Sequence, residues 1–491
     1  MNWYEQIHHI GPAFALLLGA GVVMTADLIA PRRAPVVALT VLVLVVAGVW
    51  AIVQAVSGID GPALAGAVVV DRFALFFAFL LIGVSLAVVI ATAEGLSRVE
   101  HRPEFFALLL TATGAMVLLA QSNDLIAIFV ALETTSIAQF VLAGIARDDR
   151  SSEAGIKYLL SGAVAAAVLL YGFAFLFGLS GTTSLEGIAA FVQTGSDGTQ
   201  LALVLGLVLV AAGLGFKMSI APFQAWVPDV YEGSPTTVTT FLSVASKAAG
   251  FAIALRIFYG GLGGGDTFIA EHWAALIAVL AAASMCFGNA AALLQTNVKR
   301  LLAYSSIAQA GNIAVGLAAV AAGSVAGPSA VLFFLGAYAA TNVGAFLCVI
   351  VVAERIGVED LSGYAGLMKR SPIVAGVLAL CLLSLTGIPP AAGFLAKLYV
   401  FNSAVQSGHD WLVWLVVIAV LNSAVSAFYY LRWVRTMVLD EPEDEAPFHA
   451  STPVQAVLGL AALAVLFFGL IPNPLLDAAQ RAAETLVIAP P

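Results

Sequence analysis

Apolar stretches of about 20 residues recur along the whole 491-residue sequence, and they restrict the fold more than any single motif. A helix needs about 20 apolar residues to cross the hydrocarbon core of a bilayer. Hydrophobic residues make up 61% of the chain and charged residues only 10%, whereas soluble domains are about 25% charged. The sequence therefore predicts an all-α integral membrane protein, and its acidic pI of 5.1 gives no indication of nucleic-acid binding.

We count fourteen candidate spans and number them in chain order. They are expected at residues 10–29, 35–56, 73–94, 105–121, 124–146, 155–179, 200–221, 235–259, 273–294, 301–322, 328–353, 372–404, 411–436 and 455–472. The start of the chain has Glu5, His8 and His9 before the first apolar run. Because it lacks a basic leader region, it predicts the entry to a first span and not a cleaved signal peptide.

The positively charged residues support this count, because Lys and Arg gather in cytoplasmic loops. Loops after even-numbered spans and the C-terminal tail carry only Arg72, Arg256 and Arg481. Both termini are therefore expected on the outer side of the membrane. Loops after odd-numbered spans carry Arg32, Arg33, Arg98, Arg102, Arg147, Arg150, Lys157, Lys299, Arg300, Arg355, Lys369, Arg370, Arg432 and Arg435.

Two spans contain proline within their apolar run. Pro222 interrupts span 7, and the pair Pro389 and Pro390 interrupts span 12. Proline removes a backbone donor and clashes with the preceding turn, so each helix should break there. Paired broken helices in two halves of a chain indicate a transport site in an inverted repeat, although two ordinary proline kinks are the simpler alternative.

The spacing of these two spans predicts the domain organisation. Spans 7 and 12 are five spans apart, so they cross the membrane in opposite directions. This favours a five-helix unit, spans 4–8, repeated in inverted form as spans 9–13. The predicted parts are an N-terminal three-helix segment (1–104), the first repeat (105–260), the second repeat (261–436) and a C-terminal loop with span 14 (437–491).

Four charged residues lie inside the predicted spans: Glu133, Lys217, Lys247 and Lys397. A charge at the centre of a membrane helix costs roughly 2.5–3.5 kcal/mol on insertion scales. Such groups do not serve stability, so they indicate a path for an ion, most simply for protons. The alternative is that they form neutralising pairs between helices, or that a lysine such as Lys397 extends to the interface.

Electrostatic magnitudes make proton transfer between these groups plausible. Glu133 lies nine residues into its span, which places it about 14 Å deep. A carboxylate 4 Å from a lysine favours the charged amine by about 4 kcal/mol at an effective dielectric constant of 20. Moving one proton against about 150 mV costs roughly 3.5 kcal/mol. A movement of Glu133 relative to Lys217 could therefore switch that lysine between holding and releasing a proton.

Polar residues lie between the second and third lysines on spans 10 and 11. Their hydroxyl and amide groups could hold a file of water molecules, or they could equally be interhelical hydrogen-bonding residues. We expect Asp71, near span 3, at the membrane interface. The candidates for the water file are Tyr304, Ser305, Ser306, Gln309, Tyr338, Thr341 and Asn342.

The sequence offers no signature of a bound cofactor. The cysteines Cys286, Cys348 and Cys381 have no CxxC or Cys/His spacing, so neither a disulfide framework nor a zinc or iron–sulfur site is indicated. No Walker A loop and no GxGxxG after a strand occurs, so a nucleotide site is not predicted. We expect neither a metal nor a cofactor on this chain.

Three motifs resemble the antiporter-like membrane subunits of respiratory complex I. They are Asp124 to Gly144, which contains Glu133; Lys217-Met-Ser-Ile-Ala-Pro-Phe-Gln-Ala-Trp-Val-Pro-Asp-Val-Tyr-Glu-Gly-Ser-Pro; and Asn297-Val-Lys-Arg-Leu-Leu-Ala-Tyr-Ser-Ser. The match covers about residues 105–436. The chain lacks the long lateral helix of the family's larger distal member, and it has Lys397 where the middle member has glutamate.

The resemblance implies a proton route through Glu133, Lys217, Lys247 and Lys397, driven by quinone reduction elsewhere in an NADH:quinone oxidoreductase. It implies neighbouring membrane-arm subunits and a lateral helix as partners, together with membrane lipids, and a bacterial inner membrane as the location. Flavin, iron–sulfur clusters and quinone are then expected elsewhere in the complex. Family members often have histidine where Gln309 stands, and because glutamine cannot titrate, a relay there must run through water.

Three other functions remain open from the sequence. The chain could be a subunit of a cation/proton antiporter, or a membrane subunit of a related hydrogenase or ferredoxin-linked complex. It could also be a silent scaffold that holds a membrane arm together and moves nothing. Sodium-dependent transport, the co-purifying partners and the tolerance of the buried charges to neutral replacement would distinguish these functions.

Overall fold

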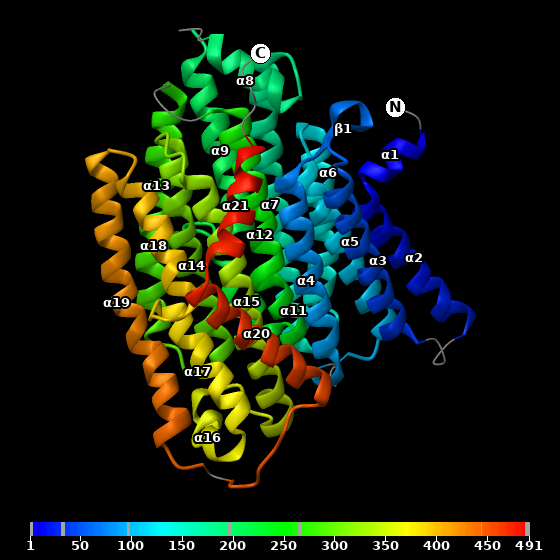
Figure 1. The fold of residues 1–491 in the computed structure, drawn as a ribbon, viewed down its shortest axis with the longest axis vertical. Helices are drawn as coiled ribbons and strands as arrows, with labels where there is room; N and C mark the ends of the chain where they lie inside the picture. The colour runs from blue at the N-terminus through cyan, green and yellow to red at the C-terminus, as the bar shows by residue number, and fades with distance from the viewer. Residues whose placement is uncertain are drawn as a thin grey trace.

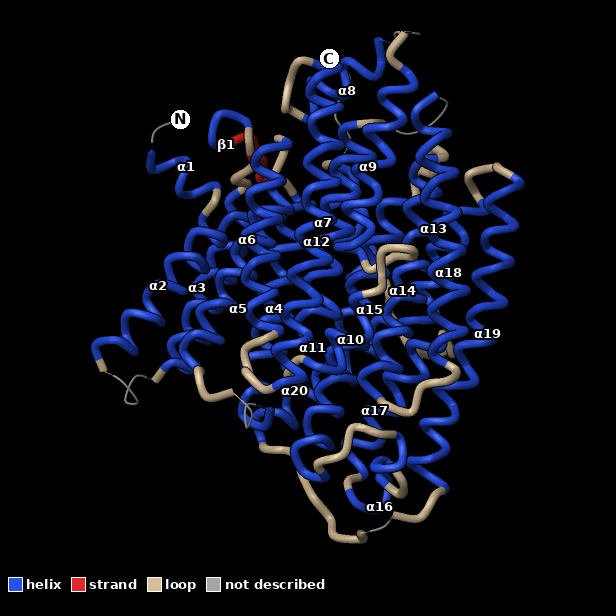
Figure 2. The backbone as a smooth tube through the Cα atoms, turned by 180° about the vertical axis from the view of Figure 1, so that it is seen from behind, coloured by secondary structure: helices blue, strands red, loops and turns tan. Residues whose placement is uncertain are grey.

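A computed structural model of the chain describes residues 3–30, 35–95, 99–194, 198–263, 268–442 and 444–486. The helices form one bundle in which most run along the same direction, with α1 and α8 at one end and α16 at the other (Figure 1). Figure 2 shows the same bundle from behind, almost entirely helical apart from short loops and one small hairpin. Because α16 contains Lys369 and Arg370, we call its side of the bundle the basic end.

The described helices have the following bounds. The N-terminal part contains α1 (Trp3–His9), α2 (Gly11–Ile29), α3 (Val36–Ser57) and α4 (Arg72–Gly95). Next come α5 (Arg102–Gln121), α6 (Leu125–Ala143), α7 (Asp149–Ser180), α8 (Leu185–Thr194), α9 (Gln200–Met218), α10 (Trp226–Gly233), α11 (Thr236–Phe241) and α12 (Lys247–Ala254). The remaining helices are α13 (Phe268–Ala292), α14 (Val298–Ala321), α15 (Gly327–Ile356), α16 (Leu367–Arg370), α17 (Pro372–Thr386), α18 (Ala392–Val405), α19 (Asp410–Leu439), α20 (Thr452–Leu470) and α21 (Asn473–Glu484).

Among the described residues, thirteen helical segments are long and apolar enough to cross a membrane. They correspond to thirteen of the fourteen predicted spans, and the predicted span 12 is divided into the shorter apolar helices α17 and α18. The predicted all-helical membrane fold is therefore confirmed, whereas the inverted relation between the two five-helix units remains a prediction. Of the predicted basic loop residues, Arg32, Arg33 and Arg98 lie outside the described residues.

Several short elements have no counterpart in the sequence prediction. The strands β1 (Gly61–Ala63) and β2 (Val68–Val70) form an antiparallel hairpin between α3 and α4. The span between residues 236 and 261 is not a regular α-helix, because two π-helical turns, η2 (Leu242–Ser246) and η3 (Leu255–Gly261), flank α12. Such turns shift the register of a helix and often occur at functional sites.

A buried ion pair joins the N-terminal part of the chain to the eighth span. Arg256 was counted with the loop residues although it falls within the predicted span 235–259. It lies in η3 inside the span, where its charge is neutralised within the protein. Its two terminal nitrogens donate to the Asp71 carboxylate at 2.9 Å each, and its Nε donates to the Ala120 carbonyl at 2.8 Å. The guanidinium also lies over the Phe73 ring, 4.8 Å from its centroid. This pair fixes α4 and α5 to the core.

We expect Asp71→Asn to destabilise the protein by about 3–5 kcal/mol, because it leaves the buried Arg256 guanidinium without its counter-charge. The measurement is thermal unfolding of the purified chain in detergent. Asp440→Asn, which changes an exposed carboxylate, is the matched control. Equal effects of the two substitutions would contradict a structural role for the pair.

Candidate functional site

The two proline-containing segments lie where helices are interrupted. Helix α9 ends at Met218, Ser219 takes a left-handed conformation with φ 63°, and the helix resumes only at Trp226. Helix α17 ends at Thr386 and α18 begins at Ala392, so the second proline pair lies between them. Each interruption leaves backbone carbonyls without helical partners at the end of the first half-helix.

Lys217 lies in the last turn of α9, and its side chain is buried. Its Nζ donates to Gln139 Oε1 at 2.9 Å and to Ser136 Oγ at 3.3 Å. The same Gln139 oxygen accepts hydrogen bonds from the Tyr158 hydroxyl at 3.1 Å and from the Ser246 hydroxyl at 3.0 Å. Gln139 is thus a shared acceptor for one cation and two hydroxyl groups.

Glu133 is on the same helix as these two acceptors and is only partly buried. Ser136 and Gln139 lie about 4.5 and 9 Å further along α6, at 1.5 Å per residue. The structure describes both Glu133 and Lys217, and neither a hydrogen bond nor an ion pair within 4 Å joins these two side chains. In this arrangement the amino group of Lys217 contacts neutral acceptors, and Glu133 lies one to two helical turns before those acceptors along α6.

Lys247 is buried at the start of α12. Its Nζ donates to both the carbonyl oxygen and the hydroxyl of Ser306 on α14. The Tyr338 hydroxyl donates to the same Ser306 hydroxyl at 3.1 Å, and the Lys247 amine lies 5.6 Å from the Tyr338 ring centroid. The Lys247 amine therefore contacts polar oxygen atoms and an aromatic ring. Among the described residues, no carboxylate lies within ion-pair distance of it.

The π-helical turn η2 connects the first two lysines. Ser246 is its last residue and points to Gln139, whereas the next residue, Lys247, reaches Ser306. Adjacent residues on a helix point in different directions, so one short segment contacts both clusters. Gly250 lies close to the first break. A Cβ at this position would be only 3.1 Å from the carbonyl carbon of Lys217, so a larger residue would push the two segments apart.

Lys397 is buried in α18 and does not extend to the interface. Its Nζ donates to the carbonyls of Leu385 and Thr386 at 3.1 and 2.9 Å, and to the Ser423 hydroxyl at 3.3 Å. These carbonyls belong to the last turn of α17, where the helix break leaves acceptors free. Gly387, at φ 91°, follows them, and a Cβ there would lie 3.0 Å from the lysine Cδ.

A small cavity of about 10 Å³ lies between the second and third lysines. Its lining includes Tyr338, which contacts the Lys247 cluster, together with Thr341, Gln309 and Lys397 itself. The Thr341 and Ser384 hydroxyls lie 3.0 Å apart on its wall. A cavity of this size is close to that needed for one water molecule beside several polar partners.

The predicted water-file residues divide into two groups. Ser306, Tyr338, Thr341 and Gln309 lie between the second and third lysines, where Gln309 donates to the Leu385 carbonyl at 2.8 Å. The other predicted residues have different direct partners, although the Tyr430 hydroxyl that pairs with Ser305 also lies near Gln309. Asn342 donates to the Ser243 hydroxyl at 2.9 Å, Ser305 pairs with the Tyr430 hydroxyl, and the partly buried Tyr304 packs near Phe287.

Sequence reasoning missed the groups that connect the lysines. Gln139, Tyr158 and Ser246 hold the first amine, and Ser384 lines the cavity near the third. Gln139 has a usable signal, since it is an amide six residues from Glu133 within an apolar span. Tyr158 and Ser246 have none, because hydroxyl residues are common in helix interfaces and only their contacts distinguish them.

An ionic network at the basic end holds α10, the helix that follows the first break. Lys299 is buried and donates to Glu359 at 3.2 Å, and Arg150 contacts the same carboxylate at 3.1 Å. Burial alone would raise the pKa of Glu359, but the two cations outweigh it and hold that pKa below its usual value. Arg300 binds Asp229 of α10 at 2.9 Å. The network fixes the helix that follows the break.

Residues 122–422 match the family described as NADH:quinone oxidoreductase/Mrp antiporter, TM. NADH-quinone oxidoreductase subunit N of Dehalococcoides mccartyi is 41% identical over 447 residues, covering 89% of this chain and 91% of the relative. The subunit N of an Anaeromyxobacter species is 41% identical over 494 residues, covering 94% of each chain. A chain of respiratory complex I from Thermus thermophilus with bound aureothin is 34% identical, with a TM-score of 0.78 over 95% of this chain and 98% of that chain.

The fold and the buried lysines define a multi-pass membrane subunit of the antiporter-like class. The family match covers more than half of the chain, and both relatives align over most of their length. The chain belongs to the NADH:quinone oxidoreductase/Mrp antiporter membrane family.

We expect Gln139→Leu to destabilise the protein by at least about 1–3 kcal/mol, because the substitution leaves buried donors without their shared acceptor. Thermal unfolding of the purified chain measures the effect. Gln406→Leu, at an exposed glutamine, is the control. A stability loss no larger than that of the control would show that the three donors find other partners.

The Glu359 network predicts a pH-dependent stability. Because the pKa of Glu359 is lower in the folded protein than its usual value of 4.5, its contribution is present above that pH and is lost as the pH falls through the folded-state pKa. Thermal unfolding of the purified chain at pH 7 should show Glu359→Gln less stable than the wild type, with a smaller difference at acidic pH. The exposed Glu441→Gln is the control, and an unchanged difference at acidic pH would contradict the assignment.

Proposed function

We propose that this chain is a proton-translocating membrane-arm subunit of an NADH:quinone oxidoreductase, coupling quinone reduction elsewhere in the complex to proton transfer. The observation that carries the proposal is the chain of three buried lysines, each held by neutral oxygen atoms. Such amines are costly to keep charged in an apolar interior. They are therefore suited to taking up and passing on a proton. Relatives named NADH-quinone oxidoreductase subunit N align with the chain over most of its length, which supports its place in such a complex.

The first transfer step lies between Glu133 and Lys217. When the carboxylate approaches the amine, the charged amine is favoured by electrostatic attraction. When the carboxylate is more distant, the amine rests on the neutral oxygens of Gln139 and Ser136, as in the present arrangement. We infer that this second arrangement favours release of the proton from Lys217, and that the oxygen lone pair of the Ser246 hydroxyl, which donates to the same Gln139 oxygen, can accept it.

The second step carries the proton from the Lys247 cluster towards Lys397. The Ser306 and Tyr338 hydroxyls begin the route on the Lys247 side. The cavity beside Thr341 and Gln309 provides room for water before Lys397. A hydroxyl or a water molecule can accept one proton while it donates another, so Gln309 need only orient the file. Ser305, Asn342 and Tyr304 make other contacts, and this route assigns them no step.

The subunit is part of a larger membrane complex, and its expected cofactors, location and partners follow from membership of that complex. Redox chemistry, flavin, iron–sulfur clusters and quinone belong to other subunits, so this chain moves protons without transferring electrons. We place it in a bacterial inner membrane with the basic end facing the cytoplasm and both termini outside. Neighbouring antiporter-like subunits and a lateral helix are its partners.

Pumping by membranes that contain the assembled complex tests this function. We expect Lys217→Ala to reduce the number of protons pumped per NADH oxidised, or NADH oxidation itself if the two are tightly coupled, because the first amine of the route is lost. Lys369→Ala, at an exposed lysine on the basic end, is the control. Assembly is checked by native gel electrophoresis.

Normal pumping per electron in an assembled Lys217→Ala complex would remove the carrier role and favour a scaffold. Pumping that requires sodium would favour the cation/proton antiporter. Co-purification with a hydrogenase or a ferredoxin-linked enzyme would assign the subunit to a related complex. These outcomes separate the proposed function from each alternative that the sequence leaves open.

A further inference from the structure

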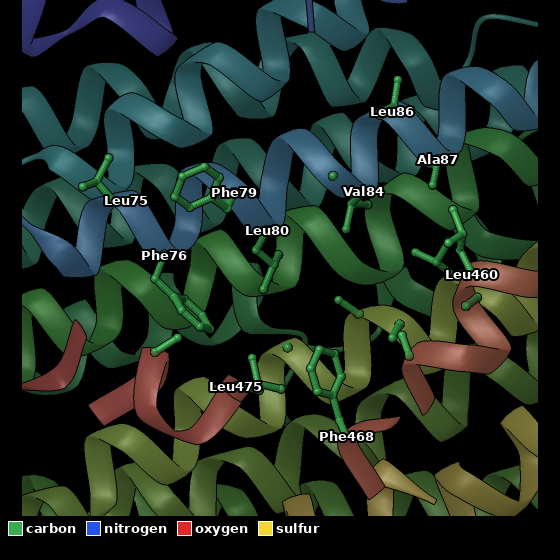
Figure 3. Close-up of a pocket in the computed structure, with 18 of the residues that line it drawn as sticks. Leu75, Phe76, Phe79, Leu80, Val84, Leu86, Ala87, Leu460, Phe468 and Leu475 are labelled. Atoms are coloured by element: carbon green, nitrogen blue, oxygen red, sulfur yellow. The ribbon is translucent and has the colours of Figure 1, made fainter. Parts of the chain in front are cut away.

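A large apolar cavity of about 910 Å³ lies away from the lysine chain, between α4, α15, α20 and α21 (Figure 3). Its volume is in the range of about 300–1,000 Å³ that is usual for small-molecule sites. Phe76, Phe79, Leu80, Leu460 and Phe468 are among the side chains that line it. All of the helices except α21 are candidate membrane spans, so the cavity opens among segments that contact lipid tails.

The cavity follows one face of α4 along most of its length. Its lining positions on this helix, from Arg72 to Ile90, recur every three or four residues with a single exception, which is the spacing of one helix face. The two ends of this stripe are about 27 Å apart at 1.5 Å per residue, close to the thickness of the hydrocarbon core, about 30 Å. The shape therefore suits a long apolar chain lying parallel to the helices.

Two arginines provide the only charges on the lining described by the structure. Arg72 begins α4, and Arg481 lies on α21. The Phe73 amide donates to the Thr485 hydroxyl at 3.2 Å, so the start of α4 and the end of α21 meet and both arginines flank the same end of the cavity. Both side chains are exposed, and neither forms an ion pair with a described residue. By contrast, the nearby Arg256 is neutralised by Asp71.

We propose that this cavity binds an anionic phospholipid, with its acyl chains along α4 and its phosphate against Arg72 and Arg481. Arginine guanidinium groups bind phosphate oxygens through paired charge-assisted hydrogen bonds. Under the predicted orientation these arginines face the outer leaflet, where positive residues are otherwise rare in this chain. The charge at one end and the apolar stripe below it match the two parts of such a lipid.

Gly83 offers a way to fill the cavity without disturbing the fold. It lines the cavity, and a Cβ at this position would meet no heavy atom within 4 Å. Gly83→Leu therefore places a side chain where the acyl chains would lie. Gly376→Leu is the matched control, because that glycine is also in a membrane helix, is exposed and has open space around its Cβ position.

Native mass spectrometry of the purified full-length chain with added phosphatidylglycerol tests the proposal. We expect about five-fold weaker binding for each of Arg72→Gln and Arg481→Gln, and loss of the bound lipid in Gly83→Leu. Arg435→Gln, at an exposed arginine on the basic end, and Gly376→Leu should bind as the wild type does. Phosphatidylcholine, which has no net charge, should bind more weakly and respond less to the arginine substitutions.

Four results would overturn the proposal. The first is phosphatidylglycerol binding that is unchanged in Arg72→Gln, in Arg481→Gln and in Gly83→Leu. The second is equal binding of the zwitterionic lipid, and the third is preferential retention of an isoprenoid quinone, since neither molecule requires the arginine pair. The fourth is a cryo-electron microscopy map of the assembled complex in which a helix of a neighbouring subunit fills the cavity. Lipid binding in this test does not depend on proton pumping, so a failure of this proposal can be distinguished from a failure of the proposed function.

Discussion

The structure depends on how buried amino groups are accommodated inside an apolar bundle. Lys217, Lys247 and Lys397 are all buried, and each donates to oxygen atoms of neutral groups. An unpaired charge in such surroundings is expensive, whereas an amine that can lose its proton is tolerated much better. The helices around them must therefore supply oxygen acceptors at membrane depth, and much of the irregular structure serves that purpose.

The irregular segments supply these acceptors in three different ways. The break after α17 exposes the carbonyls of Leu385 and Thr386 to Lys397. The π-helical turn η2 brings Ser246 to one cluster and Lys247 to the next. Elsewhere a side chain supplies the acceptor, as the Gln139 amide oxygen does for Lys217. Non-helical backbone is tolerated at this depth because it is buried within protein and its polar groups are used.

The sequence predicted the membrane spans well because their cause is local. About 20 apolar residues must cover the hydrocarbon core, and proline must interrupt a helix wherever it falls in the middle. The assignment of basic residues to loops failed at Arg256, which falls within the predicted span 235–259. Its carboxylate partner lies 185 positions away in the chain, so the sequence does not reveal it. The sequence also could not decide which of the polar residues on spans 10 and 11 contact the lysines, because spacing along a helix does not reveal which neighbour a hydroxyl meets.

The sequence by itself determined that this chain crosses a membrane many times and carries Glu133 and three lysines within the spans, since composition and hydropathy follow from the residues alone. It also determined where two helices break. Only the tertiary structure decided that Gln139, Ser246 and Ser306 join these charges, and that a lipid-sized cavity ends at two arginines. Those facts depend on which faces of distant helices meet, and helix packing is set by many contacts spread along the whole chain.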